Sequence, residues 1–270
     1  MTIKRFTPAQ RGFHLLLMLS FLVQSATGVG RMYAETGFGQ TLLVPFGGFH
    51  GALTVHKWVG IFMLILFGVH LIYLAGVFVY SGKKAVFGPD SILPGPGDVR
   101  PALAHIGWML GLKNHPRFER WAYWEKFDYW AVFWGMVIIG GTGLILYSPL
   151  ASSRIMPGWV ANVSFWVHRI EAILAMGHVF IIHFAVGHLR RKHFPMDKAI
   201  FTGYAGLNAT RSEKQAWIDR LEKEDRLKNM TGDEASVPTR AAAYTVGFLA
   251  ILTGLYILVG GLINARNITW

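Results

Sequence analysis

The chain has 270 residues, of which 53% are hydrophobic and only 15% are charged, and it contains no cysteine. Soluble domains carry about a quarter charged residues, so this composition indicates a membrane protein. Without cysteine the chain holds no disulfide, no cysteine-ligated iron–sulfur cluster and no covalently attached c-type haem. The formal charge of +11 is divided among separate basic segments, which argues against a nucleic-acid partner.

Five apolar segments are each long enough to cross a hydrocarbon core of about 30 Å, which takes about 20 helical residues. They are Phe13–Gly30, Val55–Tyr80, Tyr129–Tyr147, Phe165–Leu189 and Ala241–Ile263. We therefore predict an all-α integral membrane protein with five transmembrane helices. A secretory signal peptide is the alternative interpretation of the first segment, but that segment is long and includes His14 near its start.

Basic residues gather beside alternate ends of these segments. Three clusters precede the first segment, follow the second and follow the fourth: Lys4, Arg5 and Arg11; Lys83, Lys84, Arg100, Lys113, Arg117 and Arg120; Arg190, Arg191 and Lys192. The connections on the opposite side carry only Arg31 and Arg154 before the next segment begins. By the positive-inside rule, we expect the N-terminus in the cytoplasm and the C-terminus outside.

Ser212–Lys228, between the fourth and fifth apolar segments, is strongly charged. Its apolar residues Trp217, Ile218, Leu221 and Leu227 are spaced to form a partial apolar face on a helix. We predict a cytoplasmic amphipathic helix that lies on the protein or on the bilayer, and a dedicated site for a partner is the alternative.

The second and fourth apolar segments each contain several histidines, and ionisable side chains inside a membrane usually mark functional positions. His56 and His70 are 14 residues apart, which on an α-helix is a rise of about 21 Å and an angular offset of about 40°. His168 and His183 are 15 residues apart, with a rise of about 22 Å and an offset of about 60°. Two such helices offer imidazoles at two depths, which suits two stacked haems, each with an imidazole on both faces of its iron.

The expected orientation assigns these histidines to two levels. His56 and His168 lie near the outer surface and are the predicted ligands of the outer haem iron. His183 lies near the inner surface, where either His70 or His14 can supply the second ligand of the inner haem iron. His188, beside the basic loop, is a candidate for proton or quinone chemistry. For any one histidine taken alone, a packing or hydrogen-bonding role is the alternative.

Two long stretches resemble a known family. Glu125–Met136 (EKFDYWAVFWGM) and His183–Asp197 (HFAVGHLRRKHFPMD) are similar to the di-haem cytochrome b subunits of membrane-bound formate dehydrogenases and of related thiosulfate reductases and nickel–iron hydrogenases. The resemblance covers the first four apolar segments and the loop through Gly203. It implies a four-helix core that holds two haem b groups, with the fifth segment outside that pattern.

The same resemblance implies the ligands. Outer ligands from the second and fourth helices match His56 and His168, and inner ligands from the first and fourth match His14 and His183. His70 is then surplus to the pattern, which leaves the inner assignment open and a third haem as an alternative.

The resemblance further implies an electron-transfer subunit in the bacterial inner membrane, surrounded by lipid and without a nucleic-acid partner. Its partners would be an extracytoplasmic redox subunit, either a multihaem c-type cytochrome or an iron–sulfur protein, and quinone or quinol as substrate. The expected organisation is a di-haem core (1–203), a cytoplasmic amphipathic linker (204–240) and an additional transmembrane helix (241–270). A self-contained transmembrane reductase, a histidine-lined transporter or channel, and a purely structural anchor are the alternatives.

Overall fold

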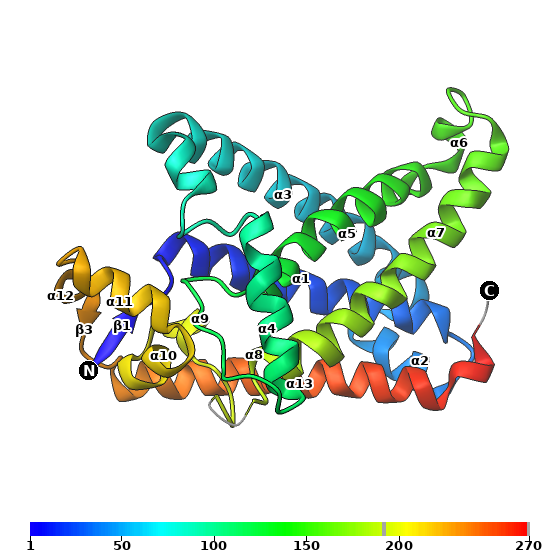
Figure 1. The fold of residues 1–270 in the computed structure, drawn as a ribbon. Coiled ribbons are helices and arrows are strands. Elements are labelled where there is room, and N and C mark those ends of the chain that lie inside the picture. Colours follow the sequence, from blue (N-terminus) through cyan, green and yellow to red (C-terminus); the bar gives the residue numbers. More distant parts are fainter. Residues whose placement is uncertain (191–192, 269–270) are drawn as a thin grey trace. The chain divides into compact units, whose positions relative to one another are not determined.

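The computed structural model describes residues 1–190 and 193–268, and helices dominate it (Figure 1). Five helices in this part of the chain are long and apolar enough to cross a membrane: α1 (Pro8–Met32), α3 (Gly48–Phe87), α5 (Tyr123–Tyr147), the continuous helix Gly158–Gly187, and α13 (Val237–Ile263). The all-α membrane fold expected from the sequence is confirmed. Four of the predicted segments lie entirely within these helices, and the fourth helix ends two residues before Leu189.

The fourth span is not a uniform α-helix. It consists of α7 (Gly158–Gly177), the π-helical segment η3 (His178–His183) and α8 (Phe184–Gly187). A π-helical turn holds one residue more than an α-helical turn, so it rotates the following side chains by about 100° relative to an unbroken α-helix. The offset of His168 and His183 calculated for an ideal α-helix is therefore wrong for this span.

Shorter elements connect the spans, and their bounds are as follows. The first two spans are joined by α2 (Gly37–Leu43) and η1 (Val44–Phe46), the next two by η2 (Pro96–Asp98) and α4 (Val99–Met109), and the third and fourth by α6 (Pro149–Ser152). Four short helices follow the fourth span, namely α9 (Ala199–Thr202), α10 (Leu207–Glu213), α11 (Gln215–Lys223) and α12 (Leu227–Met230), and η4 (Ala265–Asn267) follows the fifth.

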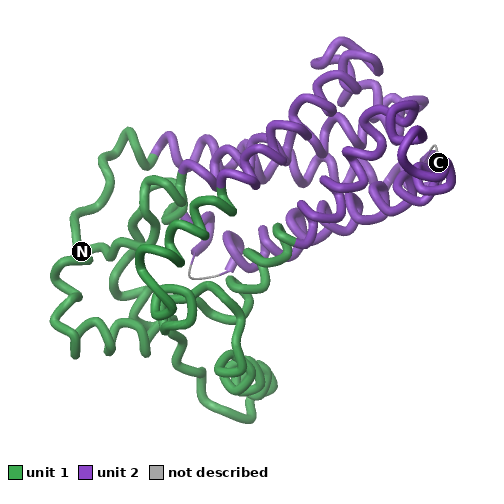
Figure 2. Tube along the Cα trace, turned by 90° about the horizontal axis from the view of Figure 1, so that it is seen from above, with its two compact units in different colours: residues 1–11, 70–133, 198–240 green, residues 12–69, 134–197, 241–270 purple. Residues whose placement is uncertain are grey.

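The chain folds as two compact units (Figure 2). Unit one contains residues 1–11, 70–133 and 198–240, and unit two contains residues 12–69, 134–197 and 241–270. Each unit therefore combines segments that are far apart in the sequence.

A small antiparallel sheet ties the N-terminus into unit one. The central strand β1 (Thr2–Lys4) pairs on one side with β2 (Tyr204–Gly206) and on the other with β3 (Thr231–Gly232). Beside the sheet, Ile3 packs in one cluster with Trp217, Ile218 and Leu221, and all four side chains are at most 1% exposed. The apolar face predicted for Ser212–Lys228 is thus buried against the start of the chain.

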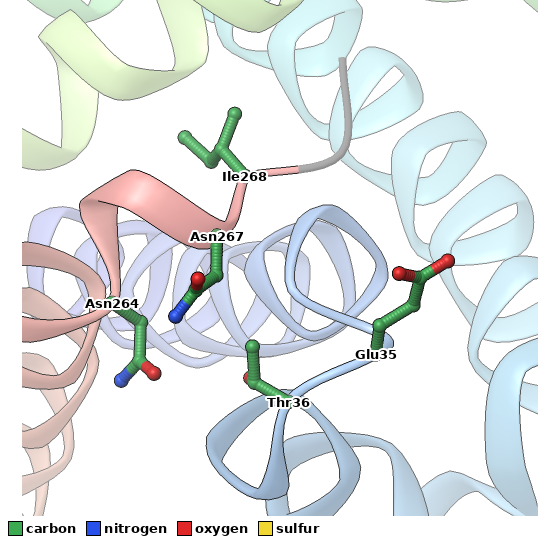
Figure 3. A pocket seen from close by; sticks show the side chains of 5 residues that line it. All are labelled: Glu35, Thr36, Asn264, Asn267 and Ile268. Atoms are coloured by element: carbon green, nitrogen blue, oxygen red, sulfur yellow. The ribbon is translucent and has the colours of Figure 1, made fainter.

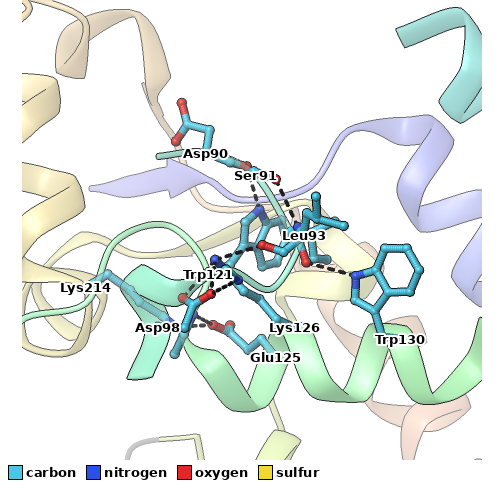
Figure 4. A network of polar contacts seen from close by, with 12 residues as sticks. Asp90, Ser91, Leu93, Asp98, Trp121, Glu125, Lys126, Trp130 and Lys214 are labelled. Atoms are coloured by element: carbon cyan, nitrogen blue, oxygen red, sulfur yellow. Dashed lines mark hydrogen bonds and ion pairs between the residues drawn. The ribbon is translucent and has the colours of Figure 1, made fainter. Parts of the chain in front are cut away.

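A buried ion network also stabilises unit one (Figure 4). The Glu125 carboxylate accepts hydrogen bonds from Arg5 at 3.0 Å, from the Ala122 backbone N–H at 2.7 Å and from Lys214. Burial lowers the pKa of Lys214, and the adjacent Glu125 carboxylate opposes that shift. The next residue, Lys126, forms an ion pair of 2.9 Å with Asp98. The charged residues that open the Glu125–Met136 stretch thus connect distant parts of this unit.

Glu125→Gln should destabilise unit one, because it leaves two cations beside an uncharged amide. Removing one partner of a buried ion pair costs about 3–5 kcal/mol. We expect faster tryptic cleavage between Arg211 and Lys228 in the purified variant. Glu234→Gln is the control, because Glu234 pairs with Arg240 on the surface and is 55% exposed. Equal cleavage rates in the two variants would show that Glu125 does not hold this unit together.

Candidate functional site

Unit two brings four of the predicted histidines together in two pairs. His56 on α3 lies beside His168 on α7, with ring centroids 6.3 Å apart and an angle of 73° between the rings. His14 on α1 lies beside His183 at the end of η3, again with centroids 6.3 Å apart, at an angle of 35°. The two pairs have the same separation, although they come from different helix combinations.

This separation fits an iron between each pair of rings. If an iron were bound by both rings of a pair, a metal–nitrogen bond of about 2.1 Å and a distance of about 1.1 Å from nitrogen to ring centre on each side would place the centroids about 6.4 Å apart. Among the described residues, no group of three or more His, Asp or Glu side chains is arranged to hold a metal ion. Pairs of histidine suit haem in particular, because the porphyrin supplies the other four ligands of the iron.

A buried threonine fixes the ring of His56. The hydroxyl of Thr27 on α1 donates a hydrogen bond to the Val23 carbonyl at 2.7 Å, so its oxygen is available as an acceptor. His56 Nδ1 lies 2.9 Å from that oxygen, and we assign the proton of the ring to Nδ1. The lone pair is then on Nε2, the nitrogen that can bind a metal.

His168 is held in the same way by the third span. Its Nδ1 lies 3.0 Å from the Ile139 carbonyl of α5, and a carbonyl oxygen only accepts hydrogen bonds. Thr142 Oγ1 lies 3.1 Å from the same nitrogen, and this hydroxyl donates to the Ile138 carbonyl at 2.7 Å. Nδ1 of His168 therefore also carries the proton, and Nε2 is left with the lone pair.

Each of these threonines is followed by a glycine that makes room for the histidine ring. A Cβ atom on Gly28 would lie 3.3 Å from Cε1 of His56, and one on Gly143 would lie 3.2 Å from Cε1 of His168. The dipeptide Thr-Gly on α1 thus supports one ring, and Thr-Gly on α5 supports the other. Our sequence reasoning missed both threonines. The sequence feature that could have identified them is the Thr-Gly dipeptide, which occurs in both the first and the third apolar segments.

The remaining predicted histidines lie in other surroundings. His70 belongs to unit one, where its Nε2 lies 2.7 Å from the hydroxyl oxygen of Tyr129 and its ring contacts Phe133. His188 is only 9% exposed, and its ring centroid is 5.8 Å from that of His183. Of the two candidates left open by the sequence, His14 is therefore the histidine found beside His183.

An open polar cavity elsewhere in unit two has a volume of about 550 Å³ (Figure 3). Its lining consists of Glu35, Thr36, Asn264, Asn267 and Ile268. None of the predicted site histidines lines this cavity, so it is separate from the two histidine pairs.

Comparison with known families agrees with the histidine geometry. The model of the family described as prokaryotic cytochrome b561 matches residues 5–203, which is most of the chain. The match confirms the resemblance carried by Glu125–Met136 and His183–Asp197, and it contains all six histidines named as site candidates. It ends before the fifth span. No curated protein matches the sequence significantly.

Gly143→Val should displace His168, because the added side chain begins 3.2 Å from the ring and overpacks the contact. We expect the purified variant to bind about half as much haem as the unmodified chain, measured by the pyridine haemochrome method. Gly141→Val is the matched control on the same helix, since a Cβ atom there meets nothing within 4 Å. Full haem content in Gly143→Val would contradict this view of the His168 environment.

Proposed function

This chain belongs to the prokaryotic cytochrome b561 family, and we propose that it carries electrons between an extracytoplasmic redox partner and the quinone pool. The family consists of all-helical membrane proteins that bind haem b and transfer electrons. The observation that best supports the finer proposal is the pair of equal histidine separations, 6.3 Å each, within one compact unit.

We propose that His56 and His168 hold one haem and that His14 and His183 hold a second. Haem b, when bound, supplies a one-electron couple of its iron. The residues of the chain orient the imidazoles and set their protonation. Thr27 and the Ile139 carbonyl keep the proton on Nδ1, so that Nε2 stays available as a ligand, and such hydrogen bonds increase the basicity of the ligand.

The proposed orientation sets the two sites on opposite sides of the bilayer. With one residue taken up by the π-helical turn, the rise between His168 and His183 is about 21 Å, most of a hydrocarbon core of about 30 Å. The basic clusters support a cytoplasmic N-terminus, which assigns His168 to the extracytoplasmic half and His183 to the cytoplasmic half. The redox partner, a multihaem c-type cytochrome or an iron–sulfur protein, would then dock near His56 and His168.

Quinone chemistry is proposed at the opposite end. His188 is buried, its ring lies next to His183, and it stands two residues before Arg190, the first of the basic residues that follow the fourth span. A histidine there can donate a proton to, or accept one from, a quinone or quinol at the cytoplasmic side. Its role in this proposal is proton exchange, while His183 serves as a ligand.

Single histidine variants test the haem assignments. His56→Ala and His168→Ala should each lose one haem of two and keep the other, and His14→Ala should lose the other one. His70→Ala is the control, because it lies on the same helix as His56 and should keep both haems. Haem content and the number of components in a redox titration give the measurement. Haem loss in His70→Ala would mean that His70 is a ligand after all.

Quinol oxidation tests the proposed function. A short-chain quinol should reduce the haem of the purified chain in a stopped-flow experiment, and His188→Gln should slow this reduction by about 10²-fold or more, as expected for loss of a general base. His178→Gln is the control within the same span. Rapid reduction by ascorbate, with none by quinol, would instead favour a self-contained reductase.

A further inference from the structure

Two arginines lie beside the pair His56 and His168. Arg169 directly follows His168, and Arg31 lies one helical turn beyond Thr27 on α1. Each guanidinium is placed against an aromatic ring: that of Arg31 is 5.2 Å from the centroid of Phe49, and that of Arg169 is 4.9 Å from the centroid of Phe165. Two different helices therefore present cations next to one candidate site.

These two cations repel each other. Arg31 interacts electrostatically with Arg169 and also with both histidines of the pair. Its Nε atom is buried and has no hydrogen-bond acceptor, and no carboxylate among residues 1–190 and 193–268 forms an ion pair with Arg31. A partly buried guanidinium without an anion is unfavourable, and a second positive charge nearby makes it more so. An anion bound beside these two cations would offset their repulsion.

We propose that Arg31 and Arg169 bind a propionate carboxylate of the haem held by His56 and His168. This inference rests on the proposed function. Haem b has two propionates at one edge of its ring, so a carboxylate must lie near the ligands of its iron. A guanidinium matches a carboxylate with two parallel hydrogen bonds, which makes arginine well suited to this group. The stacking of Arg31 on Phe49 and of Arg169 on Phe165 holds both side chains in place before haem binds.

Comparing the binding of hemin with that of its dimethyl ester tests whether the arginines bind the haem propionates or a carboxylate from another source. The ester has the same ring and iron but no negative charge on the propionates. The full-length chain carrying His183→Ala, which keeps the pair His56 and His168, is titrated with each compound while the bis-histidine absorption is recorded. We expect the ester to bind about tenfold more weakly or worse, the effect of losing charge-assisted hydrogen bonds.

Adding Arg31→Gln and Arg169→Gln to this chain should weaken hemin binding to the level of the ester and abolish the preference between the two compounds. Arg154→Gln is the matched control, because Arg154 is an exposed arginine in the connection between the third and fourth spans. It should leave the preference unchanged. If His183→Ala does not fold, His14→Ala gives a second chain that retains the same pair.

Equal affinity of the starting chain for hemin and its ester would overturn the inference while leaving the histidine assignment intact. A preference that persists in the double arginine variant would also overturn it, and would leave the arginines available for a carboxylate of a partner protein. Absence of a bis-histidine spectrum with either compound would instead refute the proposed function itself.

Discussion

The hydrogen bonds that the imidazoles of His56 and His168 make to neighbouring helices are the interactions on which the rest of the site depends. An unpaired imidazole N–H inside a membrane is unfavourable, so Nδ1 of His56 needs Thr27 and Nδ1 of His168 needs the Ile139 carbonyl. These bonds join α1 to α3 and α5 to α7. Each of these hydrogen bonds therefore holds two helices side by side, and it also determines which ring nitrogen keeps the lone pair that can bind a metal.

The fifth span, which lies outside the matched family region, supports the fourth. Gly254 of α13 leaves room for two aromatic rings, because a Cβ atom there would lie 2.6 Å from Phe180 and 2.8 Å from Phe184. These phenylalanines lie within and directly after the π-helical segment that ends at His183. Small residues allow such close packing between helices in a membrane. The extra helix thus packs against the turn that determines where His183 points.

The sequence was sufficient for the five spans, because apolar length depends only on local order. It could not reveal which helices are neighbours. Pairing of Thr2–Lys4 with Tyr204–Gly206 joins residues about 200 positions apart, and the π-helical segment has no distinctive composition. Thr27 and Thr142 looked like ordinary helix threonines, since both also bond to carbonyls of their own helix.

The sequence left both His14 and His70 as candidates beside His183 for the same reason, because it does not reveal which helices are neighbours. His70 is 14 residues from His56, about 21 Å along the helix, and His14 is 13 residues from Thr27, about 20 Å in the opposite direction along α1. Helical rise therefore predicts the same level for both histidines, so rise alone cannot separate them. The neighbouring helices distinguish the two: α1 contacts His56 through Thr27, and it also places the ring of His14 beside that of His183. One helix thereby supports a histidine of one pair and supplies a histidine of the other.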